Sequence, residues 1–203
     1  MKSMEDALRK ARGAGDRAAA EAAAERFVAV AAAEGLADVA YATVDSPFGV
    51  LLVASTGRGV VRIAFRPEDP DDVLEELSRK ISPRVLEAPA RLDDLRRELG
   101  EYFAGERHTF DLPLDWRLVR GFSERVLRAT ARIPYGSVST YMSMAAAAGN
   151  PRAYRAAGNA LGSNPIPIVV PCHRVLATGG GLGGYGGGLP MKQALLELEG
   201  ALG

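Results

Sequence analysis

The sequence predicts an α+β fold in which an antiparallel sheet with helices precedes a mostly helical half. Apolar residues alternate with a period near two between positions 39 and 65, and beyond position 116 their spacing is helical. A proline and aspartate cluster at 111–116 separates the two patterns. With 203 residues, 47% of them hydrophobic, the chain can bury a core. We expect a helical extension over 1–38, an α+β domain over 39–112 and a helical domain over 113–203.

The N-terminal half contains the strands of the predicted sheet. An alanine- and glutamate-rich segment, 16–34, precedes them and predicts a helix with a packing role. The strands are expected over 39–43, 49–54 and 60–65. The glycine-bearing segment 55–59 is typical of a turn, and it makes the last two strands antiparallel neighbours.

Helices are predicted on both sides of the domain boundary, where apolar residues recur every three or four positions. They are expected over 70–80, 91–104, 123–132 and 191–199. Pro83 and Pro89 bracket a short extended link between the first two helices.

Two further short helices indicate a helix-turn-helix. Thr140 can cap a helix that runs to position 148, the segment 149–151 breaks it, and a second helix is expected over 152–161. Arg152 and Arg155 would then lie one turn apart, so that both face a phosphate backbone. An ordinary helical hairpin is the alternative interpretation of the same pattern.

The charge of the chain is distributed unevenly, although the formal net charge is zero. The segment 116–164 contains seven arginines and one glutamate, a net charge of +6. Such asymmetry is typical of a protein with one face that meets a polyanion. Several separately solvated helix faces would give the same count.

Composition also excludes several classes of protein. One cysteine forbids an internal disulfide, and with only two histidines it cannot form a tetrahedral Cys/His zinc site within one chain. We therefore expect no metal site. No apolar run approaches the roughly 20 residues needed to span a bilayer, so we expect neither a membrane span nor a signal peptide. We therefore expect the protein to be cytoplasmic.

A glycine-rich segment, 179–188, contains a formal GxGxxG pattern at Gly181, Gly183 and Gly186. A dinucleotide site needs a βαβ unit and an acidic residue about 20 positions later, which the chain lacks. The segment instead predicts a loop that bends closely around a flat ligand, with Tyr185 as its one large wall.

Cys172, the only cysteine, is the candidate nucleophile. It follows an apolar extended segment and precedes His173 and Arg174. A thiol reacts as the thiolate, and with a free pKa of about 8.5 it needs a base or a positive field to ionise near neutrality. His173 is expected to supply the base, and Arg174 the positive field. A lone cysteine is more often a small buried hydrophobic residue, and only the sequence context favours the reactive interpretation.

That context resembles a known family. The segments IPYGSVSTY, GNPRAYRAAGNALGSNPIPIVVPCHRV and GGYGGGLPMKQALLELEG are similar to the O6-alkylguanine-DNA alkyltransferase family, over about 122–200. The resemblance implies a ribonuclease H-like N-terminal domain, a winged-helix-like C-terminal domain and no cofactor. It implies a suicide reaction in which a cysteine keeps the alkyl group from O6 of guanine, and it leaves open whether O4-alkylthymine is accepted.

The resemblance implies a role for each matching residue. Cys172 would accept the alkyl group, His173 would be its water-bridged base, and Glu199 would orient His173. Tyr141 would hydrogen-bond or protonate the leaving base at N3. Arg155 would fill the gap left by an extruded nucleotide.

The remaining implied positions contact DNA or shape the base pocket. The DNA contacts would be Thr140, Arg152 and Ala156, and the pocket residues Asn164, Val175, Tyr185 and Gly186. Asn164 would brace the active-site turn through its amide. Gly186 stands where relatives often carry serine, and it offers only a backbone amide. The partner implied is double-stranded DNA, bound by a monomer through the minor groove.

Two other functions use the same residues. A non-catalytic relative would bind alkylated DNA and signal its presence, although that branch lacks the acceptor cysteine. A cysteine hydrolase with a Cys-His-Glu triad would turn over repeatedly.

Overall fold

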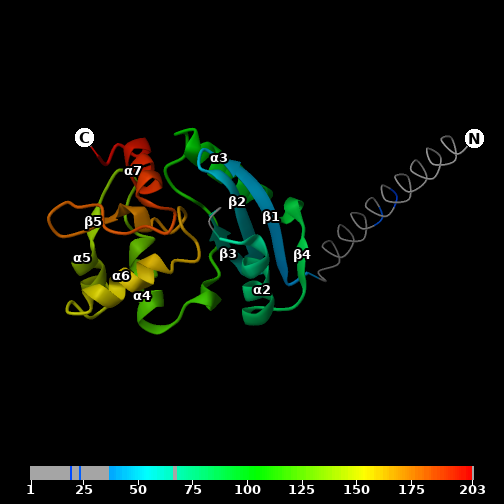
Figure 1. Cartoon of the computed structure of the whole chain (residues 1–203), viewed down its shortest axis with the longest axis horizontal. Coiled ribbons are helices and arrows are strands. Elements are labelled where there is room, and N and C mark those ends of the chain that lie inside the picture. The colour runs from blue at the N-terminus through cyan, green and yellow to red at the C-terminus, as the bar shows by residue number, and fades with distance from the viewer. Residues whose placement is uncertain (1–18, 20–22, 24–36, 66–67, 203) are drawn as a thin grey trace, which may run out of the picture.

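The computed structural model describes residues 37–65 and 68–202, together with residues 19 and 23 (Figure 1). The helix expected over 16–34 lies outside the described residues, apart from those two positions. The sheet occupies one side of the described molecule and the C-terminal helices the other. The predicted α+β fold class is confirmed.

The N-terminal part contains a four-stranded sheet. Its strands are β1 (Val39–Ser46), β2 (Gly49–Thr56), β3 (Gly59–Ala64) and β4 (Val85–Glu87), in the order β3-β2-β1-β4. The three predicted strands pair antiparallel, as expected. β4 forms from the link between Pro83 and Pro89 and pairs parallel with β1, so the sheet is mixed and not purely antiparallel. The parallel direction follows because the chain crosses a sheet face as a helix before it returns.

Helices cover both faces of the sheet. Helix α2 (Pro70–Lys80) begins where the Asp69 side chain accepts a hydrogen bond from the amide of Asp71, and it buries Val73 and Leu77. Helix α3 (Asp93–Phe103) follows a 3-10 turn over Pro89–Leu92. Neighbouring strand residues belong to different clusters: Val39, Leu52 and Ala64 pack with α2, and Ala40, Leu51 and Ile63 pack with α3.

The C-terminal part is mostly helical. It contains α4 (Gly121–Thr130), α5 (Tyr141–Ala147), α6 (Tyr154–Gly162) and α7 (Leu189–Leu198), with a parallel pair of short strands, β5 (Ser139–Thr140) and β6 (Val175–Leu176). Thr140 caps α5 as expected, because its hydroxyl accepts a hydrogen bond from the amide of Ser143 at 3.1 Å.

The prediction that Arg152 belongs to the second of these short helices is wrong. Helix α6 begins at Tyr154, and Arg152 lies in the turn before it. The amide of Ala153 donates to the carbonyl of Asn150 at 3.0 Å, which closes a turn with Pro151 at its second position. Arg152 and Arg155 are both exposed, but they are not one helical turn apart.

The two parts meet along the free edge of β3. The Val60 amide donates to the Pro113 carbonyl at 2.8 Å, and the Ile63 amide donates to the Pro165 carbonyl at 2.8 Å. A Cβ at Gly59 would overlap the Pro113 carbonyl, so only glycine allows this approach. The C-terminal part thereby covers an edge that would otherwise expose unpaired backbone groups. One hydrophobic cluster runs through both parts, and the boundary expected at 112 stays a prediction.

Candidate active site

The acceptor candidate lies at the end of a loop that one side chain holds together. Prolines at 165, 167 and 171 keep residues 164–171 from forming a helix, and Cys172 begins a 3-10 turn that ends at Arg174. The Asn164 side-chain amide donates to the Val170 carbonyl at 2.8 Å and contacts Cys172 Sγ at 3.1 Å. Its oxygen accepts from the amide of Ile166 at 3.1 Å. Asn164 therefore connects both ends of the loop to the thiol.

The loop also contains a strained residue. Ile168 has a φ of 74°, which is rare for a β-branched side chain and persists only where the surroundings enforce it. The Val170 amide donates to the Ile166 carbonyl at 2.8 Å across it. Ile168 is fully buried, so core packing holds the loop in this shape.

Four side chains form a buried polar cluster beside the loop. His173 Nε2 lies 2.9 Å from Glu199 Oε1, and Arg174 donates to both Glu199 oxygens, at 2.8 and 2.9 Å. The Tyr102 hydroxyl donates to the same carboxylate at 2.6 Å. A carboxylate only accepts, so Nε2 of His173 carries its hydrogen. The other ring nitrogen, Nδ1, is buried without a hydrogen-bond partner among the described residues.

The cluster sets the charges of its members. Burial by itself would raise the pKa of Glu199, but hydrogen bonds from His173 and Arg174 outweigh it and hold that pKa at about 2. Burial lowers the pKa of His173, against the opposing effect of Glu199. At neutral pH the cluster therefore combines a carboxylate with a neutral imidazole, which can accept a proton at Nδ1.

The thiol itself is not held as a thiolate in this structure. Burial raises the pKa of Cys172 to about 11, although the hydrogen bond from Asn164 and the charge of Lys192 oppose the rise. Cys172 is only 7% exposed. The expectation that Arg174 helps to ionise the thiol is wrong, because that guanidinium binds Glu199 and the Ile133 carbonyl. Any reaction of this sulfur as a thiolate would therefore require the loss of its proton.

Lys192 is a buried cation that the sequence does not predict. It is fully buried on α7, and its Nζ donates to the carbonyls of Val175, at 2.6 Å, and Leu182. It thereby ties β6 to the glycine-rich loop. The spacing of Lys192 and Glu199, seven positions apart on an otherwise apolar helix face, is the pattern from which both buried charges could be inferred.

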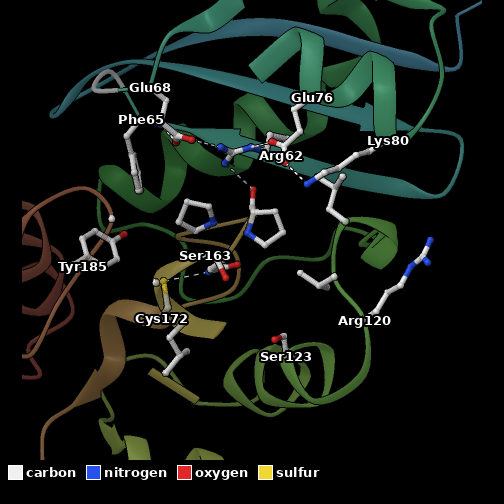
Figure 2. A pocket seen from close by; sticks show the side chains of 18 residues that line it. Arg62, Phe65, Glu68, Glu76, Lys80, Arg120, Ser123, Ser163, Cys172 and Tyr185 are labelled. Carbon is white, nitrogen blue, oxygen red and sulfur yellow. Dashed lines mark hydrogen bonds and ion pairs between the residues drawn. The ribbon is translucent and has the colours of Figure 1, made fainter. Parts of the chain in front are cut away.

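Cys172 opens into a cavity of about 560 Å³ (Figure 2). Asn164, Tyr185 and Gly186 line it as expected. Phe65 from the N-terminal part lies against Tyr185, with ring centroids 5.7 Å apart. Val175 does not line the cavity, since it is fully buried in β6. A flat aromatic ligand could therefore lie between the thiol and an aromatic wall.

Tyr141 does not line this cavity but packs against the glycine-rich loop. A Cβ at Gly183, where φ is 68°, would overlap the Tyr141 hydroxyl. The Tyr141 ring also lies over Gly158 of α6. Glycine is thus required at 183 for two reasons: the backbone φ is positive, and Tyr141 leaves no room for a Cβ.

The expected DNA contacts lie on or next to the two short helices. Arg155 and Ala156 are exposed on α6, Arg152 is exposed in the preceding turn, and Thr140 caps α5. The Arg155 guanidinium lies over the Tyr154 ring at 5.7 Å. Among the described residues no carboxylate pairs with Arg155, whereas Arg117 and Arg128 pair with Asp115 and Glu124.

Two further searches cover the described part of the chain only. It contains no group of three or more His, Cys, Asp or Glu side chains that could hold a metal ion. None of its helices is both long and apolar enough to cross a membrane.

Comparison with known proteins accounts for this arrangement. Residues 39–116 match the ribonuclease-like domain, and residues 121–201 the DNA binding domain, of 6-O-methylguanine DNA methyltransferase. The chain belongs to the 6-O-methylguanine DNA methyltransferase family. The resemblance inferred from the segments around Cys172 is confirmed, and the family match extends it to the N-terminal part.

Relatives in this family are similar over most of their length. The methylated-DNA–protein-cysteine methyltransferase of Mycolicibacterium paratuberculosis is 45% identical over 161 residues, which cover 79% of this chain and 92% of the relative. The constitutive enzyme of the same name from Bacillus subtilis is 39% identical, covering 78% and 94%. A crystal structure of Mycobacterium tuberculosis OGT in complex with DNA has a TM-score of 0.68 at 39% identity, covering 80% and 93%.

Besides Lys192, two residues of the N-terminal part reach the site without being expected from the sequence. Tyr102 of α3 donates to Glu199, and Arg62 of β3 lines the cavity. Tyr102 follows Leu92, Leu95 and Leu99 on the apolar face of its helix, and a hydroxyl at such a position needs a buried acceptor. The partner could not be inferred, because Glu199 is 97 positions away.

Proposed function

We propose that this chain repairs DNA by irreversible transfer of the alkyl group from O6 of an alkylated guanine to Cys172. The observation that carries the proposal is the position of the thiol, on the wall of an aromatic-lined cavity and in the same turn as His173, which pairs with the buried Glu199. Membership of the 6-O-methylguanine DNA methyltransferase family supports it. The chain itself is the acceptor, so each molecule reacts once.

The chemistry begins with the thiol proton. Because Glu199 accepts from Nε2, the lone pair of His173 lies on Nδ1, and we propose that water carries the Cys172 proton to that atom. The sulfur then attacks the alkyl carbon, so that a sulfur–carbon bond forms as the carbon–O6 bond breaks. The electron pair of the broken bond stays on guanine.

Guanine then takes up one proton. In our proposal Tyr141 donates it at N3, and the proton held by His173 replaces it through solvent. The products are S-alkylcysteine and intact guanine, and no cofactor enters the balance. Tyr185, whose buried hydroxyl has no partner among the described residues, is available to a base in the cavity.

We propose that α5, the turn at 148–153 and α6 act as a helix-turn-helix that binds the minor groove of duplex DNA. Five of the seven arginines in 116–164 are exposed and have no ion pair among the described residues, which supports a polyanion as the partner: Arg120, Arg125, Arg132, Arg152 and Arg155. Arg155 would enter the stack while the damaged nucleotide rotates out, at a cost of a few kcal/mol that is lowest for a poorly paired base. Binding should weaken with salt. A monomeric state and a cytoplasmic location stay predictions.

Mass spectrometry of the intact protein tests the reaction. After incubation with a duplex that contains O6-methylguanine, we expect a gain of one methyl group on Cys172 at one equivalent per chain. Cys172→Ser should show no gain and should still bind the duplex, because serine is nearly isosteric but far less acidic. Tight binding without a mass change would support a damage sensor, and release of product beyond one equivalent would support a hydrolase.

A further inference from the structure

Arg62 is an arginine of the N-terminal sheet that reaches the loop of the acceptor cysteine (Figure 2). It belongs to the edge strand β3 and lines the same cavity as Cys172. The residue is 8% exposed, which is unusual for a cation unless it is bound on several sides.

The contacts of Arg62 connect α2 with the loop. One Nη donates to the Ile63 carbonyl at 2.7 Å and lies 3.4 Å from the Pro165 carbonyl. The other Nη pairs with Glu68, and Nε lies 3.8 Å from Glu76 of α2. The two carboxylates thus occupy Nε and one Nη, which leaves the second Nη for the carbonyls of Ile63 and Pro165.

A β-bulge gives Arg62 this direction. Ser55 pairs with Val60 but Ala54 pairs with Arg62, so Val61 is the extra residue in β3. Without the bulge Arg62 would share a face with Val60, on the side of α3. The bulge moves it to the face that carries α2, where Glu76 lies.

Two groups of β3 thus contact the Pro165 carbonyl. The Ile63 amide donates to it at 2.8 Å, and Arg62 approaches the same oxygen. Pro165 directly follows Asn164, whose side chain contacts Cys172 Sγ. A shift of the carbonyl would move the Asn164 backbone, and with it the amide that contacts the thiol.

We propose that Arg62 is a positioning residue for alkyl transfer, which fixes the loop 164–172 through the Pro165 carbonyl and so aligns Asn164 with Cys172. This inference rests on the proposed function. Its substrate is the same alkylated guanine in DNA, and Arg62 contributes to the rate of transfer and not to DNA affinity. It gives the N-terminal domain a part in the reaction.

Arg62→Met tests the inference, since methionine keeps the unbranched stem and removes every donor. Arg79→Met is the matched control, because Arg79 is an exposed cation of the same domain, on α2. The transfer rate is measured under single-turnover conditions at saturating duplex from pH 6 to 9, and the duplex Kd is measured separately. Hydrogen–deuterium exchange of the peptide that contains 164–172 gives a readout that needs no reaction.

We expect Arg62→Met to lower the transfer rate at saturating duplex at least tenfold across this pH range, with a Kd within twofold of the unsubstituted protein. Exchange in 164–172 should increase. Arg62→Lys, which can still reach one acceptor, should recover part of the rate, and Arg79→Met should change neither rate nor exchange. If Arg62→Met does not fold, Glu68→Gln serves as the second variant, because it weakens the ion pair of Arg62 at an exposed residue. We expect its transfer rate to be about threefold lower than that of the unsubstituted protein.

Equal rates and equal loop exchange in Arg62→Met and Arg79→Met would overturn the inference. A loss of duplex affinity that accounts for the whole effect would overturn it as well, because Arg62 would then act in binding. If the unsubstituted protein transfers no alkyl group, the proposed function fails instead, and loop exchange still decides whether Arg62 holds the loop.

Discussion

His173 Nε2 and Glu199 Oε1 lie 2.9 Å apart, and both side chains are fully buried. The contact connects the 3-10 turn that begins at Cys172 to the end of α7, and Tyr102 connects the same carboxylate to α3. A buried carboxylate with three bound partners is expensive to disturb. The base proposed for Cys172 is therefore held by elements from both parts of the chain.

The low pKa of Glu199 predicts how stability depends on pH. The pKa is about 2 in the folded chain against an ordinary value of 4.5, so the stabilising contribution is complete above pH 4.5 and is lost as pH falls towards 2. That difference corresponds to about 3 kcal/mol. Urea unfolding between pH 6 and 2.5 measures it.

In Glu199→Gln, the fall in stability between pH 4.5 and 2 that comes from Glu199 should be absent. The stability of this variant at neutral pH should be lower by about 3 kcal/mol, because Arg174 loses its buried partner. Glu197→Gln is the control, since Glu197 is exposed on the same helix. Identical pH dependence in the two variants would show that Glu199 is not the titrating group.

The raised pKa of Cys172 predicts the pH dependence of its reactivity. Because the thiol ionises at about 11, its reaction with iodoacetamide should rise about tenfold per pH unit from pH 7 to 10 without levelling near 9. The hydrogen bond from the Asn164 amide lowers the pKa of Cys172. Asn164→Ala removes it, so the pKa should rise and the reaction should become slower still. Asn159→Ala, an exposed position on α6, should leave the profile unchanged. A plateau above pH 9 would contradict the prediction.

Arg155→Ala should separate binding to duplex DNA from chemistry at the thiol. We expect repair of O6-methylguanine in a duplex to fall at least tenfold, because the substitution removes the guanidinium that we propose fills the gap in the stack. Reaction with free O6-benzylguanine, which needs no rotation out of a stack, should stay within twofold. Equal losses on the two substrates would place Arg155 in the catalytic step and refute the role in DNA.

Gly183→Ala should displace Tyr141. The substitution puts a side chain in the left-handed region, at a cost of about 1–2 kcal/mol, and its Cβ would overlap the tyrosine hydroxyl. We expect a lower Tm and a transfer rate reduced at least tenfold. Gly184→Ala is the matched control, because a Cβ there meets nothing within 4 Å. Equal behaviour of the two variants would count against a role for Tyr141 in transfer.

Local patterns in the sequence predict most of the elements. Period-two alternation predicts the three antiparallel strands to within a few residues, and helix α2 has the predicted bounds of 70–80. The start of α6 was missed because Pro151 favours a closed turn over a first helical turn, and the Ala153–Asn150 hydrogen bond then places Arg152 outside the helix. Strand β4 was missed because a three-residue strand has no period of its own.

The site divides in the same way. Cys172, His173 and Asn164 are close in sequence, so their motif predicts that they lie together. Tyr102, Arg62 and Lys192 come from other segments. Local spacing can indicate that Tyr102 and Lys192 are buried but not which groups they contact, and all three reach the site only because α3, β3 and α7 pack around it.

The sequence by itself determined the α+β class, the family and the identity of the single thiol, because these depend on residue types and on their spacing along the chain. The tertiary structure alone decided the ionisation of that thiol and the partners of its base. Burial and long-range hydrogen bonds shift the pKa of a group through whatever surrounds it, and those surroundings come from segments far apart in the chain. The same reason explains why Arg174, two positions after Cys172 in the sequence, stabilises Glu199 and not the thiolate.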